Sequence, residues 1–127
     1  MLEGVFDGTN YVAVKRMLDA TAMRHAAISN NIANLETPGY QRQDVRADFQ
    51  TELNRLITTG NTAEMRTLRP EIEVDPLSAA RNPNGNTISL DRELLELNRN
   101  SLQYETLTQF ASGSLRHLKM AITGRQP

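Results

Sequence analysis

The sequence predicts an all-α fold in which two long terminal helices pair as a coiled-coil-like hairpin, joined by an extended or partly disordered middle segment. Apolar residues recur every three or four positions near both ends of the chain, but no such period is sustained from Thr58 to Ile88. Three prolines, Pro70, Pro76 and Pro83, interrupt that stretch. The chain has no Trp or Cys and only three Tyr and three Phe. Its core must therefore be mainly aliphatic, which suits thin seams between helices.

The N-terminal helix is expected within residues 1–35. Asp7 or Thr9 can cap its start. It must end before Pro38, which lacks a backbone N–H and disfavours helical geometry in the preceding residue. Residues at three-four spacing form a single stripe, whose apolar members we expect to pack against another helix; the stripe comprises Tyr11, Val14, Leu18, Thr21, His25, Ile28, Ile32 and Leu35.

Residues 36–88 are expected to form a turn and an irregular middle segment with one short helix near residues 49–57. The apolar side of this helix consists of Phe49, Leu53, Leu56 and Ile57. The residues from Glu71 to Asp75 alternate like a short strand, but prolines bound them on both sides. We therefore expect the segment to be extended or disordered in the isolated chain.

The C-terminal helix is expected within residues 89–124. Ser89 is a suitable N-cap, and Gly124 is a suitable residue to end the helix. A second apolar strip, with Leu95 and Leu102, runs beside the main stripe, so one partner helix would leave part of this surface in water. The residues of the main stripe are Leu90, Leu94, Leu97, Ser101, Tyr104, Thr108, Ala111, Leu115, Leu118 and Ile122. The two helices and the middle segment are expected to make one structural domain with paired termini.

Composition and spacing exclude several functional classes. Fourteen basic and fifteen acidic residues give a net charge of −1, so the basic excess of a nucleic-acid binder is absent. No apolar run is long enough to span a membrane, and the N-terminus does not resemble a cleaved signal peptide. His25 and His117 lack the neighbouring ligands or nucleophile that a metal or catalytic site needs. We therefore expect no enzyme activity, no cofactor and no metal site, and on these residues alone a soluble cytoplasmic protein.

One string of residues resembles a known family. Asn30-Asn31-Ile32-Ala33-Asn34, followed after two residues by Thr37-Pro38-Gly39-Tyr40, resembles the N-terminal signature of bacterial flagellar rod, hook and hook-filament junction proteins. Pro38-Gly39 also suits the centre of a type II turn, because Gly adopts a positive φ without steric cost. In the second half, Asn84-Gly85-Asn86, Ser89-Leu90-Asp91-Arg92-Glu93, Leu107-Thr108-Gln109 and Ala121-Ile122-Thr123-Gly124-Arg125 are similar to the proximal rod proteins of this family.

The resemblance implies a structural subunit of the basal-body rod that assembles helically through its terminal helices into the torque-transmitting shaft. It implies export through the flagellar apparatus without a cleaved signal peptide, and a final position in the periplasmic rod. The implied partners are copies of itself, other rod subunits, the basal-body adaptor at the membrane ring and the export apparatus. The implied assembly motif is Asn30, Asn31, Ile32, Ala33, Asn34, Thr37, Pro38, Gly39 and Tyr40.

Two questions stay open at this point. The amides of Asn30, Asn31 and Asn34 could cap the helix and face solvent, or they could be buried and set the register between adjacent subunits. The chain could also be a soluble helical chaperone or regulator that binds a partner helix in the cytoplasm. A chaperone should be a folded dimer, whereas a rod subunit should be partly unfolded alone and completed by its neighbours. Far-UV circular dichroism of the dilute monomer separates these expectations.

Overall fold

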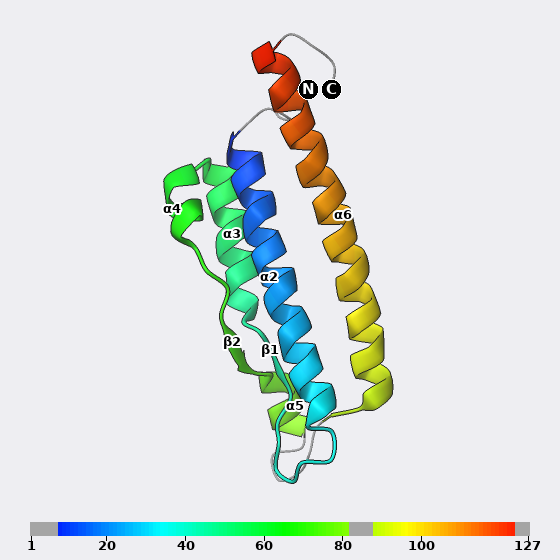
Figure 1. Ribbon diagram of the computed structural model, residues 1–127. Helices are drawn as coiled ribbons and strands as arrows, with labels where there is room; N and C mark the ends of the chain where they lie inside the picture. Colours follow the sequence, from blue (N-terminus) through cyan, green and yellow to red (C-terminus); the bar gives the residue numbers. More distant parts are fainter. Residues whose placement is uncertain (1–7, 82–87, 124–127) are drawn as a thin grey trace.

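The computed structural model describes residues 8–81 and 88–123. Two long helices, one from each end of the chain, lie side by side and run in opposite directions (Figure 1). This confirms the predicted all-α fold with paired terminal helices. The elements in chain order are α2 (Gly8–Ala33), β1 (Gln43–Val45), α3 (Ala47–Thr59), α4 (Thr62–Thr67), β2 (Ile72–Val74), α5 (Pro76–Arg81) and α6 (Leu90–Thr123).

Helix α2 is the central element, because it packs against α6 on one side and against α3, α4 and β1 on the other (Figure 1). Its side toward α6 includes Val14, Thr21 and Ile28 of the predicted stripe, all of them buried. A second buried side, with Ala13 and Ala20, was not part of that stripe. Helix α2 is therefore covered on two sides.

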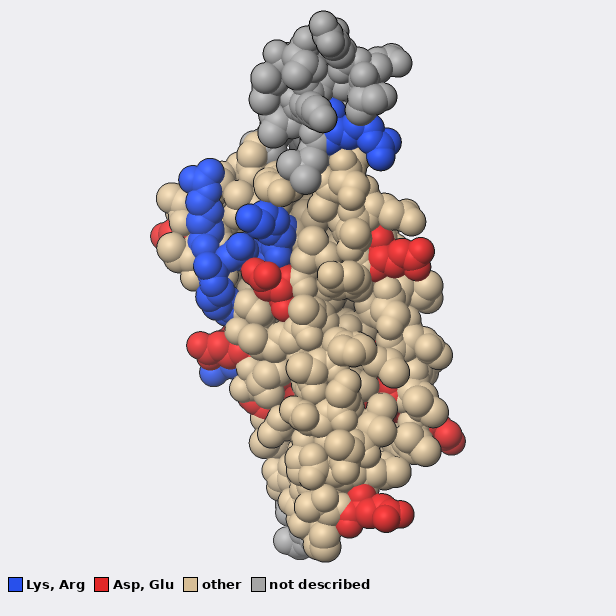
Figure 2. All heavy atoms as spheres, in the orientation of Figure 1, with Lys and Arg blue, Asp and Glu red and all other residues tan. Residues whose placement is uncertain are grey.

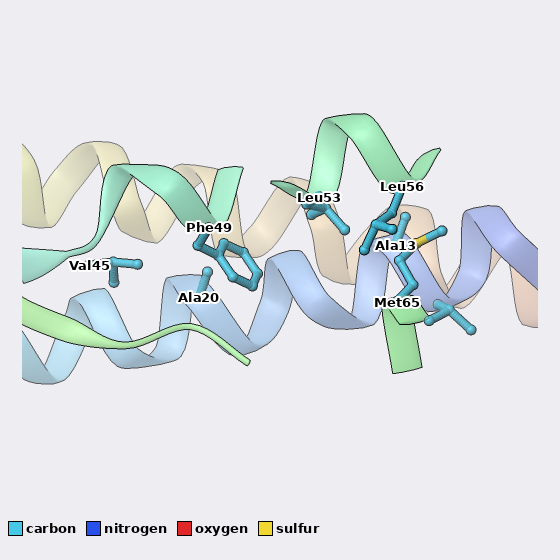
Figure 3. Packing of buried hydrophobic residues seen from close by; sticks show 8 residues of the cluster. Ala13, Ala20, Val45, Phe49, Leu53, Leu56 and Met65 are labelled. Carbon is cyan, nitrogen blue, oxygen red and sulfur yellow. The ribbon is translucent and has the colours of Figure 1, made fainter. Parts of the chain in front are cut away.

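The hydrophobic core lies between α2 and the middle segment, away from α6 (Figure 3). Leu53 and Leu56 of α3 and Met65 of α4 have 0–1% of their surface exposed. The predicted short helix thus exists as α3, and its apolar side supplies much of the core. The full cluster is Val12, Ala13, Ala20, Val45, Phe49, Leu53, Leu56 and Met65.

The middle segment also contains a two-stranded antiparallel ribbon. Strands β1 and β2 pair with Gln43 opposite Val74 and Val45 opposite Ile72. The prolines that argued against a strand lie just outside it, and Pro76 occupies the first position of α5, where a missing backbone N–H has no cost. Each strand is three residues long, too short for its alternation to stand out in the sequence.

Helix α6 is turned so that two polar residues, Glu93 and Asn100, are buried in its contact with the rest of the chain. Three residues predicted to pack, Leu90, Leu94 and Tyr104, are instead 42%, 45% and 48% exposed in the single chain. The rotation of α6 about its own axis follows from the hydrogen bonds of these two buried polar residues, which are described below. Packing of these three side chains against neighbouring chains stays a prediction.

The remaining predicted packing residues are half-buried or lie where side chains are not described. Half-buried residues are Leu18, Ile32, Leu35, Leu97 and Ala111. Leu115, Leu118 and Ile122 lie in α6, but their side chains are outside the described part of the structure. Gly124 and the Asn84-Gly85-Asn86 string also lie outside the described residues.

Candidate functional site

Helix α2 ends in the motif turn that the sequence predicts. The Tyr40 N–H donates to the Thr37 carbonyl at 3.2 Å, and Gly39 has a φ of +76°, as the third position of a type II turn requires. The Asn34 side chain donates to the Asn30 carbonyl at 2.8 Å, which satisfies an acceptor in the last turn of the helix. The turn brings the chain back toward α2 and so positions β1.

Asn31 is the buried amide of the motif, with 0% of its surface exposed. Its Nδ2 donates to the Gln43 carbonyl at 2.9 Å and to Glu93 Oε2 at 3.3 Å. Its Oδ1 accepts from the Gln43 N–H at 2.9 Å and from the Tyr40 hydroxyl at 3.2 Å. One side chain therefore joins the end of α2 to the motif turn, to β1 and to α6.

Arg42 carries a buried charge close to Asn31. It is 2% exposed, and its Nε donates to Glu93 Oε1 at 2.5 Å. Its Nη1 donates to Asp75 Oδ2 at 3.1 Å and to Asp44 Oδ2 at 3.2 Å. Burial alone would lower the pKa of Arg42, but its bonds to the carboxylates, that to Glu93 foremost, raise it. The guanidinium thus stays charged between carboxylates from β1, α6 and the residue before α5.

We call Asn31, Arg42, Asp75 and Glu93 the polar cluster. Burial and the charge of Glu93 also raise the pKa of the adjoining Tyr40 hydroxyl, so Tyr40 remains a neutral donor. Moving an ion pair out of water costs free energy, which the pair recovers only when its geometry is good and its remaining hydrogen bonds are satisfied. Here Asn31 supplies a bond to the second oxygen of Glu93, so the cluster meets that condition.

Asp75 makes the cluster sensitive to acid. Burial would raise the pKa of this carboxyl, but hydrogen bonds from Ser78, from the Leu77 N–H and from Arg42, together with the Arg42 charge, lower it below its ordinary value. A lowered folded-state pKa means that the unfolded chain binds more protons, so the stability gained is present above the unfolded pKa and lost as pH falls through the folded one. The free energy of unfolding should therefore decrease below about pH 5.

Urea unfolding followed at pH 7, 5, 4 and 3 measures this effect. Asp75→Asn removes the titrating group and should give a flatter dependence of the unfolding free energy on pH. An equally steep dependence in the variant would contradict the role of Asp75.

The structure separates the predicted motif into a buried part and an exposed part. Asn31 is buried within the chain, while Ile32, Asn34 and Tyr40 are half-buried. The exposed residues are Asn30, Ala33, Thr37, Pro38 and Gly39. Of the two interpretations of the amides, Asn34 fits helix capping, and Asn31 makes its hydrogen bonds inside the chain. Any contact of the motif with a neighbour would use the exposed residues.

Sequence reasoning missed the partners of Asn31. In the sequence, Arg42 looks like one of many charged residues of a mixed-charge surface, and Glu93 looks like an ordinary acidic residue in the first turn of a helix. Both are buried, and they lie 51 positions apart in the chain. Glu93 does follow Ser89, whose Oγ accepts from the Arg92 N–H at 3.5 Å, but its side chain points into the cluster. No local pattern in the sequence marks such a pair.

The contacts of the polar cluster indicate that it stabilises the fold and does not bind a ligand. The amide of Asn31 and the carboxylates of Glu93 and Asp75 already make hydrogen bonds to other side chains or to the backbone of the described residues. Among those residues, no group of three or more His, Cys, Asp or Glu side chains is placed to hold a metal ion. None of the described helices is both long and apolar enough to cross a membrane. The surface that is available to bind other molecules lies elsewhere, along α2 and α6.

Comparisons with known proteins find the same family that the motif suggests. A family model described as "Flagella basal body rod protein" matches residues 11–41, which cover most of α2 and the motif turn. The flagellar basal body rod protein FlgB of Aquifex aeolicus is 34% identical over 123 residues, covering 95% of this chain and 97% of that protein. FlgB of Escherichia coli is 30% identical over 78% of this chain and 82% of its own length. FlgB of Bacillus subtilis is 25% identical over 94% and 97%.

Proposed function

The chain belongs to the FlgB family of flagellar basal body rod proteins, and we propose that the outer surfaces of α2 and α6 are the contacts through which it assembles. It is a structural subunit of the bacterial flagellar rod, located in the basal body with the other rod components. A protein with this role needs stiff elements along the shaft and surfaces that join one subunit to the next. Long helices supply stiffness, and contacts that do not close on themselves give a helical filament.

The exposed apolar surface of α6 is the observation that carries this proposal. Leu95, Leu102 and Phe110 are 49%, 65% and 50% exposed, in addition to Leu90, Leu94 and Tyr104. Several large apolar side chains exposed along one helix indicate an interaction site. In Figure 2 the lower middle of the visible face carries few charged side chains, while basic residues gather at its upper left and acidic residues are scattered along its right edge. This area is suited to burial against other subunits.

The position of the chain in the cell follows from the same proposal. We place it in the proximal, periplasmic part of the rod, in contact with copies of itself, with other rod subunits and with the adaptor at the membrane ring. It would reach that position through the flagellar export apparatus without a cleaved signal peptide. Its role there is mechanical, with no catalytic activity. The exposed side of α6 supports the proposed export, since a subunit that is completed by its neighbours can remain loosely folded before export.

Mass spectrometry of purified hook-basal bodies tests the proposed function. We expect this chain at a few copies per particle, in basal bodies extracted with detergent. Its absence from basal bodies, together with an abundant folded dimer in the soluble fraction, would contradict the proposal and favour a chaperone that binds partner helices.

Pro38→Ala is expected to impair assembly more than folding. Pro38 is exposed, and its loss should lower the free energy of unfolding by about 0.4–1 kcal/mol, because a more flexible unfolded chain loses more entropy on folding. It should lower incorporation into basal bodies by more than this loss explains, since the turn sets the angle at which the middle segment leaves α2. Pro76→Ala, at the exposed start of α5, is the matched control. Equal incorporation of both variants would contradict the prediction.

A further inference from the structure

One exposed line on α2 is formed by small side chains. Ala22, Ala26, Ser29 and Ala33 are exposed and recur every three or four residues, so they lie above one another on the helix. Small side chains let the backbone of another helix approach closely. We call these four residues the seat.

Hollows flank the seat on both sides at the level of Ala22. One, of about 380 Å³, lies toward α6 and is lined by Thr21, Ala22, His25, Asn100, Ser101 and Tyr104. The other, of about 560 Å³, lies toward the middle segment and is lined by Asp19, Ala22, Met23, Ala26, Arg69 and Pro70. A helix laid along the seat can place large side chains in both hollows, as ridges fit grooves in helix packing.

A buried acceptor in the first hollow lacks a partner. Asn100 is 4% exposed, and its Nδ2 donates to the Thr21 carbonyl at 2.8 Å. Its Oδ1 is buried and, among the described residues, accepts no hydrogen bond. A buried acceptor without a donor is unfavourable, so a partner that brings a donor to this acceptor would gain a hydrogen bond. The helix that fills the hollow should therefore carry an N–H or O–H donor beside its apolar residues.

The outer face of α6 has this combination. Leu95 and Leu102 are separated by seven positions and lie on the side of α6 opposite to buried Glu93 and Asn100. Asn98, Thr106 and Gln109 are exposed on the same side and offer uncharged donors. We call Leu95, Asn98, Leu102, Thr106 and Gln109 the ridge.

We propose that the ridge of one copy of this chain docks on the seat of the next copy, with Asn98 or Gln109 donating to Asn100 Oδ1. This proposal rests on the proposed rod function and specifies its self-contact. Large apolar side chains with uncharged donors meet small side chains with hollows and a free acceptor, so the two surfaces complement each other. Seat and ridge are different surfaces of one molecule, and the contact is therefore head-to-tail. Repeated, it gives an open helical arrangement rather than a closed dimer.

Disulfide cross-linking between two single-cysteine variants tests the contact, since the natural chain contains no cysteine. Cells produce Ala26→Cys and Leu102→Cys chains together, and their hook-basal bodies are purified and oxidised. We expect a disulfide-linked dimer of this chain only where both variants are present. Thr51→Cys, on the exposed side of α3, replaces Ala26→Cys in the control and should give at least tenfold less dimer with Leu102→Cys.

The outcomes separate this contact from the function itself. If both variants are present in basal bodies but give no dimer, or give as much dimer in the Thr51→Cys control, the contact is wrong and the rod function stands. Cross-links from Leu102→Cys to a different rod protein, identified by mass spectrometry, overturn the choice of a second copy as partner. If the unmodified chain is itself absent from basal bodies, the proposed function fails first.

Discussion

Arg42→Ala is expected to lower the free energy of unfolding by about 3–5 kcal/mol. The substitution removes the guanidinium that Glu93, at 0% exposure, and Asp75, at 9% exposure, share. Glu93 would keep its charge without a cation beside it, or would have to take up a proton. A buried charge that loses its partner is far more costly than the pair itself was stabilising. Urea unfolding followed by far-UV circular dichroism at pH 7 measures the loss.

Arg46→Ala is the control for the loss of an arginine. Arg46 lies four positions further along and pairs with Asp48, but its side chain is 44% exposed, so its removal should change stability far less than the removal of Arg42. A double variant, Arg42→Met with Glu93→Leu, should recover much of the loss, because the fully buried charge of Glu93 is removed together with its partner, while Asp75 keeps its hydrogen bonds from Ser78 and the Leu77 N–H. If Arg42→Ala is no more destabilising than Arg46→Ala, the polar cluster does not hold α6 in place.

Asn31→Ala is expected to lower the free energy of unfolding by about 3 kcal/mol. The buried amide donates to the Gln43 carbonyl and to Glu93, and it accepts from the Gln43 N–H and the Tyr40 hydroxyl. All four groups would lose a partner, and each buried group left without one costs about 1–3 kcal/mol. Water entering beside the half-buried Tyr40 would compensate part of this, so the expected loss is smaller than the sum.

Asn30→Ala is the matched control, one position earlier in the same helix. Asn30 is exposed, and its backbone carbonyl, which accepts from the Asn34 side chain, is kept in the variant, so the change should stay within about 0.5 kcal/mol. Thermal or urea unfolding of both variants gives the comparison. Equal stability of the Asn31 and Asn30 variants would show that the buried amide is not what joins α2 to β1.

The parts of the fold that depend on local pattern could be predicted from the sequence. Three-four periodicity predicted both long helices, since helical packing repeats within a few residues. Pro38-Gly39 predicted the turn after α2, since the backbone demands of these two residues are local. The surplus of apolar residues on the C-terminal helix predicted that a single chain leaves part of this helix exposed, as the exposed Leu102 and Phe110 confirm.

The polar cluster and the orientation of α6 could not be predicted in the same way. Asn31, Arg42 and Glu93 meet through contacts between residues 51 and 62 positions apart. In the sequence, a buried Arg–Glu pair looks like any exposed pair of opposite charges. The apolar stripe through Leu90 and Leu94 suggested one face of α6, but the hydrogen bonds of Glu93 and Asn100 turn a neighbouring face toward α2.

Labelling of Leu102→Cys with a maleimide tests the central claim, that the outer face of α6 is free in the isolated chain and covered in the rod. Leu102 is 65% exposed, so the isolated variant should react rapidly. In purified, intact basal bodies the same cysteine should react at least tenfold more slowly, and it should react fully after the basal bodies are denatured. Equally fast labelling in intact basal bodies and in the isolated chain would contradict assembly through this face.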